Sequence, residues 1–204
     1  MTRRPRPKLL WNARLDRAVA YAGKVHKRHK RKGTTIPYIA HLLDVASVAL
    51  KHSATEDEVV AALLHDTLED GADPQKIRRE IRRGFGSAVL RIVDACTDTT
   101  ESPKPDWLTR KKRYVAGITK KTPAEKFVSA CDKVANVTDM IEGHRLQGAK
   151  MWDRFSADSD RVLWYYRACA RGFAKGQQSE KLARVVELLG SRVRKLARLN
   201  PTQS

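Results

Sequence analysis

The chain has 204 residues, and its 41 Lys and Arg against 23 Asp and Glu give a formal net charge of +18 at pH 7. This length suits one ordinary domain and is short for two. No stretch approaches the roughly 18 consecutive apolar residues that a membrane-spanning helix requires, so we exclude a membrane protein. The positive charge attracts polyanions of every kind, which leaves nucleic acids, nucleotides and acidic proteins open as partners.

The three cysteines, Cys96, Cys131 and Cys169, stand alone within apolar helical patterns, without a C-x-x-C pair. This arrangement predicts small core residues of a cytoplasmic protein and argues against disulfides and thiolate metal ligands. No apolar segment of signal-peptide length follows the basic start of the chain.

Apolar residues recur at helical spacing along almost the whole chain, and no run alternates as a strand does. The sequence therefore predicts an all-α fold, a compact single-domain bundle of about eight or nine helices. We expect residues 1–11 to form a basic N-terminal extension, residues 12–199 the domain, and residues 200–204 a short tail.

The first predicted helix covers residues 14–29 and ends in a strongly basic loop. The second covers residues 38–52. The third begins at Thr55, because its hydroxyl and the carboxylate of Glu58 three residues later form the pattern of a capping box.

Asp73 and Pro74 predict the start of a fourth helix, as cap and first-turn residue, and a fifth covers residues 87–97. Residues 97–106 then form the longest predicted loop. A loop of this length in a compact domain is typical of a lid or a substrate edge, although a plain surface connection remains the alternative.

Four more helices complete the prediction: residues 107–120, a helix that begins at Thr122, residues 157–174 and residues 179–199. The helix after Thr122 places Asp132, Asn136 and Asp139 on one polar stripe beside its apolar stripe. The last two helices are amphipathic and predicted to be structural.

The densest cluster of reactive side chains follows the apolar part of the third helix, in residues 61–70. On a helix, His65 and Glu69 share one face at i,i+4. Asp66 and Asp70 share another in the same way. A hydrophobic core does not need these groups, so the cluster indicates metal binding or proton transfer.

A metal at this cluster needs ligands from elsewhere in the chain. His41 lies on an otherwise apolar helix, and Asp132 lies on a mostly apolar one as a charge without an evident partner. Burying either alone is costly. With His65 and Asp66 they form a mixed nitrogen and oxygen shell that suits a divalent first-row ion and leaves positions for water and a phosphate oxygen.

In this order and spacing, His41, the pair His65-Asp66 and Asp132 resemble the H…HD…D signature of the HD phosphohydrolase superfamily. Four segments carry a narrower resemblance, to the hydrolase domain of RelA/SpoT proteins and small stand-alone alarmone hydrolases: residues 31–41, 62–70, 85–86 and 132–136.

This resemblance implies an enzyme that removes the 3′ pyrophosphate from guanosine 3′,5′-polyphosphates with a manganese ion, or with another divalent first-row metal. It implies four metal ligands: His41, His65, Asp66 and Asp132. Glu69 and Asp70 match a pair that positions and activates the attacking water. It implies five substrate contacts: Arg31, Lys32, Asn136, Arg161 and Tyr165.

Two features depart from the pattern of these hydrolases. Ala135 stands where they carry a histidine next to Asn136, which puts rate and substrate fit in question. Residues 96–107, together with a basic cluster at residues 110–113, resemble a less characterised bacterial branch of HD proteins. The basic cluster fits a phosphate-binding rim and a plain charged face equally well.

Three functions therefore stay open. The first is a phosphohydrolase acting on guanosine polyphosphates or on a different small nucleotide. The second is a basic nucleic-acid-binding protein on an HD scaffold, which the charge suggests, although the sequence has no evident recognition motif. The third is a metal-binding regulatory protein that has lost catalysis, and only Ala135 suggests it. Oligomeric state is not encoded in any of these patterns.

Overall fold

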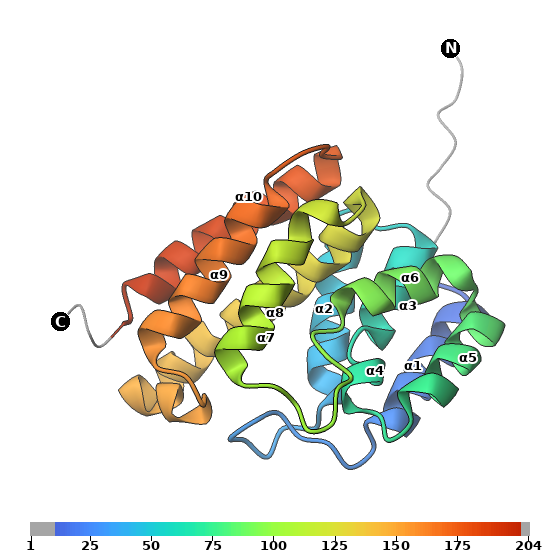
Figure 1. Ribbon diagram of the computed structural model, residues 1–204, viewed down its shortest axis with the longest axis horizontal. Helices are drawn as coiled ribbons and strands as arrows, with labels where there is room; N and C mark the ends of the chain where they lie inside the picture. Colours follow the sequence, from blue (N-terminus) through green and yellow to red (C-terminus); the bar gives the residue numbers. More distant parts are fainter. Residues whose placement is uncertain (1–10, 201–204) are drawn as a thin grey trace.

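The computed structural model describes residues 11–200, so most of the predicted N-terminal extension and of the predicted tail lies outside the described residues. Within this range the regular elements are all helices, joined by loops, and one isolated bridge links Lys30 and Pro37 (Figure 1). The α-helices are α1 (Ala13–Val25), α2 (Ile39–Lys51), α3 (Glu56–Leu64), α4 (Thr67–Asp70), α5 (Pro74–Phe85), α6 (Ser87–Cys96), α7 (Trp107–Gly117), α8 (Pro123–Gln147), α9 (Ser159–Phe173) and α10 (Glu180–Ala197). Because α4 is a single turn, the other nine match the predicted number in the described range, and the all-α fold is confirmed.

Two short 3₁₀ segments, Ile118–Lys120 and Gly148–Arg154, directly follow α7 and α8. None of the described helices is both long enough and apolar enough to cross a bilayer.

Helix α8 is the centre of the fold and contacts α2, α3, α6, α9 and α10 (Figure 1). Every residue from Lys126 to Ala135 is buried, because neighbouring helices cover this half of α8 on all sides. The predicted start signals are present. Thr122 and Glu125 form a capping box at α8, as Thr55 and Glu58 do at α3.

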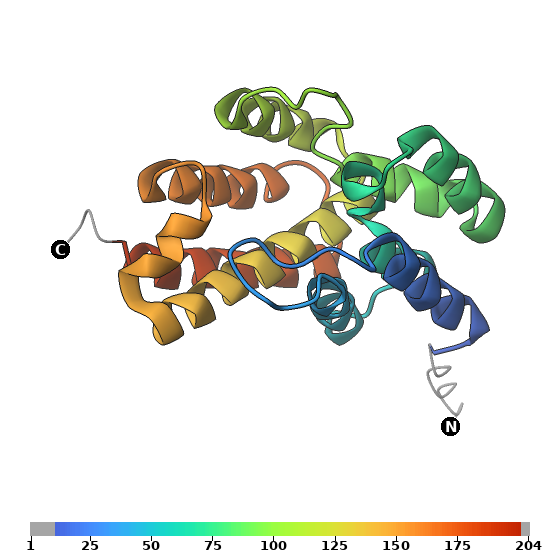
Figure 2. The same cartoon turned by 90° about the horizontal axis from the view of Figure 1, so that it is seen from below.

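The first helix is shorter than predicted, because α1 ends at Val25 with His26 as its cap residue. Residues 27–38 instead form a loop that crosses α8 (Figure 2), and Arg31 in this loop bonds to α8 side chains. In a helix, the basic side chains of this segment would lie three or four residues apart on one face and repel one another, whereas the extended loop separates these charges.

The third helix also ends before its reactive cluster, at Leu64, so the metal-binding motif does not lie on one continuous helix as predicted. The hydroxyl of Thr67 donates to the Leu64 carbonyl at 2.6 Å, and the His65 Nδ1 lies 2.8 Å from the Ala62 carbonyl. These side chains satisfy the last carbonyls of α3 and end it. Asp66 therefore occupies a turn, and α4 starts anew at Thr67.

Candidate metal centre and substrate cavity

Three helices and one turn bring the predicted ligands together. His41 lies in the first turn of α2, His65 follows α3, Asp66 occupies the turn, and Asp132 lies in the buried half of α8. The His41 Nε2 is 3.2 Å from Asp132 Oδ1 and 3.6 Å from Asp66 Oδ2. The His65 Nε2 is 3.0 Å from Asp66 Oδ2 and 3.6 Å from Asp132 Oδ1. Ligand atoms about 2.1 Å from one cation are separated by about 3.0 Å in octahedral and about 3.4 Å in tetrahedral geometry, so these spacings are close to those of a shared coordination shell.

The two imidazoles are ready to act as ligands. His41 and His65 are only 4% and 1% exposed, and neither Nε2 makes a hydrogen bond within the described residues. The His65 Nδ1 donates to the Ala62 carbonyl, so Nε2 is the nitrogen that faces Asp66 and that would bind a metal after losing its proton. Buried nitrogens without a donor, facing carboxylates, form an arrangement that a divalent cation completes. The residues present therefore fit a divalent metal.

The charges of the cluster are strongly coupled. Burial raises the pKa of Asp66, but the neighbouring His65 outweighs it and the pKa falls below its usual value. Burial likewise opposes ionisation of Asp132, and Lys133 overcomes it, so this pKa lies well below the usual range. Both carboxylates are thus ionised at neutral pH. Burial lowers the pKa of His41. Burial also opposes the charged form of His65, but Asp66 outweighs it and raises the His65 pKa well above its usual value, so a cation that binds here would displace the His65 proton.

The centre opens into a cavity of about 220 Å³ between the α1–α2 loop, α4, α7, α8 and α9. Its lining contains five carboxylates, namely Asp66, Glu69, Asp70, Asp98 and Asp132, and three cationic side chains, namely Arg31, Lys111 and Lys133. The cavity is therefore lined by more carboxyl groups than cationic groups, which favours a bound cation.

The two predicted water-activating residues both line this cavity. Glu69 accepts a hydrogen bond from Lys104 Nζ at 3.3 Å and one from the Asp98 backbone N–H at 3.4 Å. Burial, with the negative charges of Asp66 and Glu69, raises the pKa of Asp70 to about 7. Asp70 can therefore exchange a proton near neutral pH.

Arg31 and Asn136 meet at the edge of the cavity. The Arg31 guanidinium donates to Asn136 Oδ1 at 2.8 Å and to Asp139 Oδ2 at 3.1 Å, and it lies 5.6 Å from the centre of the Tyr38 ring. Asn136 in turn donates to Asp132. Lys32 does not line the metal cavity. It lines the adjoining hollow, to which Arg31 and Asn136 also contribute.

The two predicted contacts on α9 differ in position. Tyr165 is buried in the cavity wall, with Lys111 Nζ 4.9 Å from its ring centre. Arg161 is exposed, lines neither the cavity nor the adjoining hollow, and pairs with Asp158 at the start of α9. The structure does not bring Arg161 to the rest of the predicted site.

Several cavity residues had no predicted role. Tyr38 donates a 2.6 Å hydrogen bond to Asp66 Oδ2, and its position three residues before His41 was the only sequence signal. Asp98 accepts hydrogen bonds from Arg110 and Lys111 and so fastens the loop after α6 to α7. Because Lys111 lines the cavity, one member of the basic cluster 110–113 contributes to its rim.

Ala135 does not face this cavity. It lines a separate groove between α2, α8 and α10 together with Ser47, His52 and Leu188. The replacement of the expected histidine therefore leaves the lining of the metal cavity unchanged.

The fold and the site define an all-helical protein with a buried His and Asp centre for a divalent cation, open to a charged cavity. The family model described as HD domain matches residues 18–148, so the chain belongs to the HD domain family. The chain is similar to the human guanosine-3′,5′-bis(diphosphate) 3′-pyrophosphohydrolase MESH1, with 36% identity over 69% of this chain and 80% of the relative. A bacterial enzyme of the same activity, from Aquifex aeolicus, is 31% identical over 60% of this chain, which spans 17% of that larger protein.

Solved structures show the same fold. A metazoan SpoT ortholog superposes with a TM-score of 0.68 at 20% identity, over 92% of this chain and 96% of the other. The Listeria monocytogenes protein lmo0812 superposes with a TM-score of 0.63 at 25% identity, over 76% and 99%. The predicted membership of the HD superfamily and the likeness to RelA/SpoT-type hydrolases are confirmed.

Proposed function

We propose that this protein is a metal-dependent phosphohydrolase that removes the 3′ pyrophosphate from guanosine 3′,5′-polyphosphates, with Mn²⁺ or another divalent first-row ion. The observation that carries the proposal is the convergence of four side chains, the buried His41, His65 and Asp132 and the partly buried Asp66, beside a cavity with cationic and aromatic walls. The names of relatives such as human MESH1 indicate the substrate.

These four side chains would hold a divalent cation, which would supply a bound water of lowered pKa and polarisation of the phosphoryl group. The chain supplies the groups that position and deprotonate that water. Glu69 is held in place by Lys104 and the Asp98 N–H, so its carboxylate is a fixed acceptor for a water hydrogen. Asp70, whose pKa is about 7, takes up the released proton at one of its carboxylate oxygens.

The other wall of the cavity suits a nucleotide with several phosphates. Lys111 and Arg31 supply cations for phosphate oxygens, and both are held by carboxylates that limit their motion. Aromatic side chains provide surfaces on which a purine base stacks. These are Tyr38, Trp107, Phe155, Tyr165 and Tyr166. Arg161 has no part in this proposal, because it lies outside the cavity.

The test is pyrophosphate and phosphate release with added Mn²⁺ from a panel of ppGpp, pppGpp, their adenosine counterparts, NADPH and ordinary nucleoside triphosphates. We expect selective pyrophosphate release from ppGpp and pppGpp, lost in Asp66→Ala. Turnover of a different member would keep the mechanism and replace the substrate. No turnover of any member by metal-loaded protein would contradict the proposal, and salt-dependent duplex binding would then favour a nucleic-acid function.

A further inference from the structure

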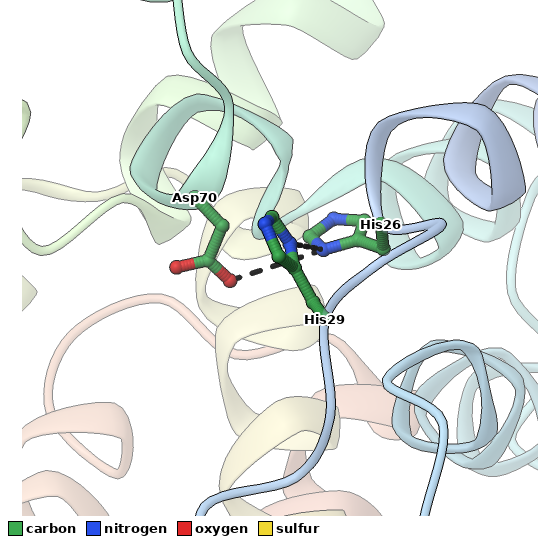
Figure 3. A group of neighbouring side chains, drawn as sticks. All are labelled: His26, His29 and Asp70. Atoms are coloured by element: carbon green, nitrogen blue, oxygen red, sulfur yellow. Dashed lines mark hydrogen bonds and ion pairs between the residues drawn. The ribbon is translucent and has the colours of Figure 1, made fainter.

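A second group of metal-binding side chains lies beside the first, and it shares none of the four ligands of that centre. His26 is the cap residue of α1, His29 lies in the loop that follows, and Asp70 is the last residue of α4. Figure 3 shows the three side chains directed toward one another. The His26 Nδ1 is 3.2 Å from the His29 Nδ1 and 3.9 Å from Asp70 Oδ2.

The spacing of these atoms is close to that of a coordination shell. Two nitrogens bound tetrahedrally to zinc at about 2.05 Å are about 3.3 Å apart, which the 3.2 Å between the two histidines matches. The contact to Asp70 is longer than this ideal by about half an ångström. The Asp70 side chain is 27% exposed, so a small rotation can close that gap.

We propose that His26, His29 and Asp70 form a second divalent metal site, with Zn²⁺ as the ion that two imidazoles and one carboxylate suit best. Three protein ligands leave a fourth position for water, and His29 and Asp70 keep the site open to solvent because both are only partly buried.

The surroundings hold His26 in the orientation that the site needs. Its ring is almost completely buried and stacks on the Tyr38 ring, with 4.8 Å between centres and 12° between planes. Burial lowers the His26 pKa to about 4, so the ring is neutral at pH 7. When no cation is bound, only one of the two facing Nδ1 atoms carries a proton between them, and the 3.2 Å contact is a single hydrogen bond.

Tyr38 contacts both centres. One face of its ring covers His26, while its hydroxyl donates to the first-centre ligand Asp66. Asp70 lines the hydrolytic cavity, so a cation on Asp70 would take away the carboxylate that accepts the water proton. Excess Zn²⁺ should therefore inhibit the Mn²⁺-loaded enzyme, and His29→Gln should relieve that inhibition. This consequence rests on the proposed function, whereas the existence of the site does not.

The test is the number of Zn²⁺ ions bound by the full-length chain, from calorimetric titration and from metal analysis after dialysis. We expect two ions per wild-type chain and one per His29→Gln chain, because glutamine keeps the size and polarity of the residue but is a poor zinc ligand. The matched control is His52→Gln, a half-buried histidine that contacts the Val48 carbonyl in a different part of the protein, and it should still bind two.

Asp132→Asn distinguishes binding at the two centres. It should weaken Zn²⁺ binding at the first centre and leave the Zn²⁺ affinity of the second unchanged. Circular dichroism confirms that each variant is folded. One ion per wild-type chain, with the same value for His29→Gln, would overturn the proposal, as would an equal loss in His52→Gln. Two ions on a protein that hydrolyses nothing in the nucleotide panel would support the site while the proposed function fails.

Discussion

The floor and the rim of the cavity are built in different ways. The floor consists of His41, His65, Asp66 and Asp132, which come from helices packed in the core or from the turn that ends one of them. The rim includes Arg31, from the α1–α2 loop, and Lys111, from α7, and both are fixed by ion pairs to carboxylates. Outside the lining, Lys104 pairs with the cavity residue Glu69. The floor therefore has the rigidity that a metal shell requires. The residues of the rim, which lie on a loop and on α7, can differ between related proteins that bind different substrates.

The floor should show the largest effect when one ligand is changed. Asp132→Asn keeps the shape of the side chain but removes a ligand charge and leaves the buried Lys133 without its ion pair. We expect hydrolysis to fall by at least about 10³-fold, because a bound metal supplies several kcal/mol of transition-state stabilisation. The control is Glu142→Gln, an exposed change on the same helix. Activity within tenfold of wild type in folded Asp132→Asn would refute the ligand role.

Two lysines beside the Tyr114 ring show what the Asp132 carboxylate contributes. Lys121 and Lys133 both place Nζ near the Tyr114 ring, at 3.8 Å and 4.8 Å from its centre. Burial lowers the pKa of Lys121 to about 8. Burial acts on Lys133 in the same sense, but Asp132 outweighs it and the pKa is raised well above its usual value. The ion pair with Asp132 therefore keeps Lys133 protonated, whereas Lys121, which has no such carboxylate partner among its leading influences, loses its proton more easily.

This contrast predicts a stability that depends on pH. Between pH 8 and pH 10.5 the unfolded chain holds a proton on Lys121 that the folded chain has released, so this residue makes stability rise with pH. The free energy of unfolding of Lys121→Met should therefore be about 1–3 kcal/mol higher than that of wild type at pH 7, and this advantage should fall below about 1 kcal/mol near pH 10. Urea unfolding at both pH values measures it, with the exposed Lys120→Met as control. An advantage that does not change with pH would point to packing instead of charge.

The same division explains how much could be read from the sequence. The helix starts at Thr55 and Thr122 were predictable, because a capping box acts within a few residues of its own position. The meeting of His41, His65, Asp66 and Asp132 was predicted from their residue types and from the resemblance to HD phosphohydrolases, and their role as metal ligands stays a prediction. The hydrogen bond from Tyr38 to Asp66 joins residues 28 apart, and no local pattern predicts it. The break after Leu64 was missed for a different reason. The bonds of His65 and Thr67 to the helix carbonyls span only three residues, but apolar periodicity alone indicates a longer helix.

The rim should show a moderate effect, on binding more than on chemistry. In Lys111→Met one phosphate-binding cation is lost, while Arg110 still holds Asp98 and the loop after α6. We expect KM for ppGpp to rise about tenfold, equal to about 1.4 kcal/mol, with kcat within about threefold. The neighbouring Lys112→Met is exposed and should behave as wild type. A loss confined to kcat would instead move Lys111 from substrate binding into the chemical step.

The smallest effect should come from Ala135, although the sequence marks it as the most conspicuous departure from related hydrolases. Its side chain faces the groove between α2, α8 and α10 and not the metal cavity, and this groove of about 430 Å³ has room for a larger residue. We expect Ala135→His to change kcat/KM for ppGpp by less than about twofold, below about 0.4 kcal/mol. A gain or loss of tenfold would show that this groove is coupled to the floor through α8. The rigid floor would then have to include the side of α8 that faces this groove as well as the side that carries Asp132.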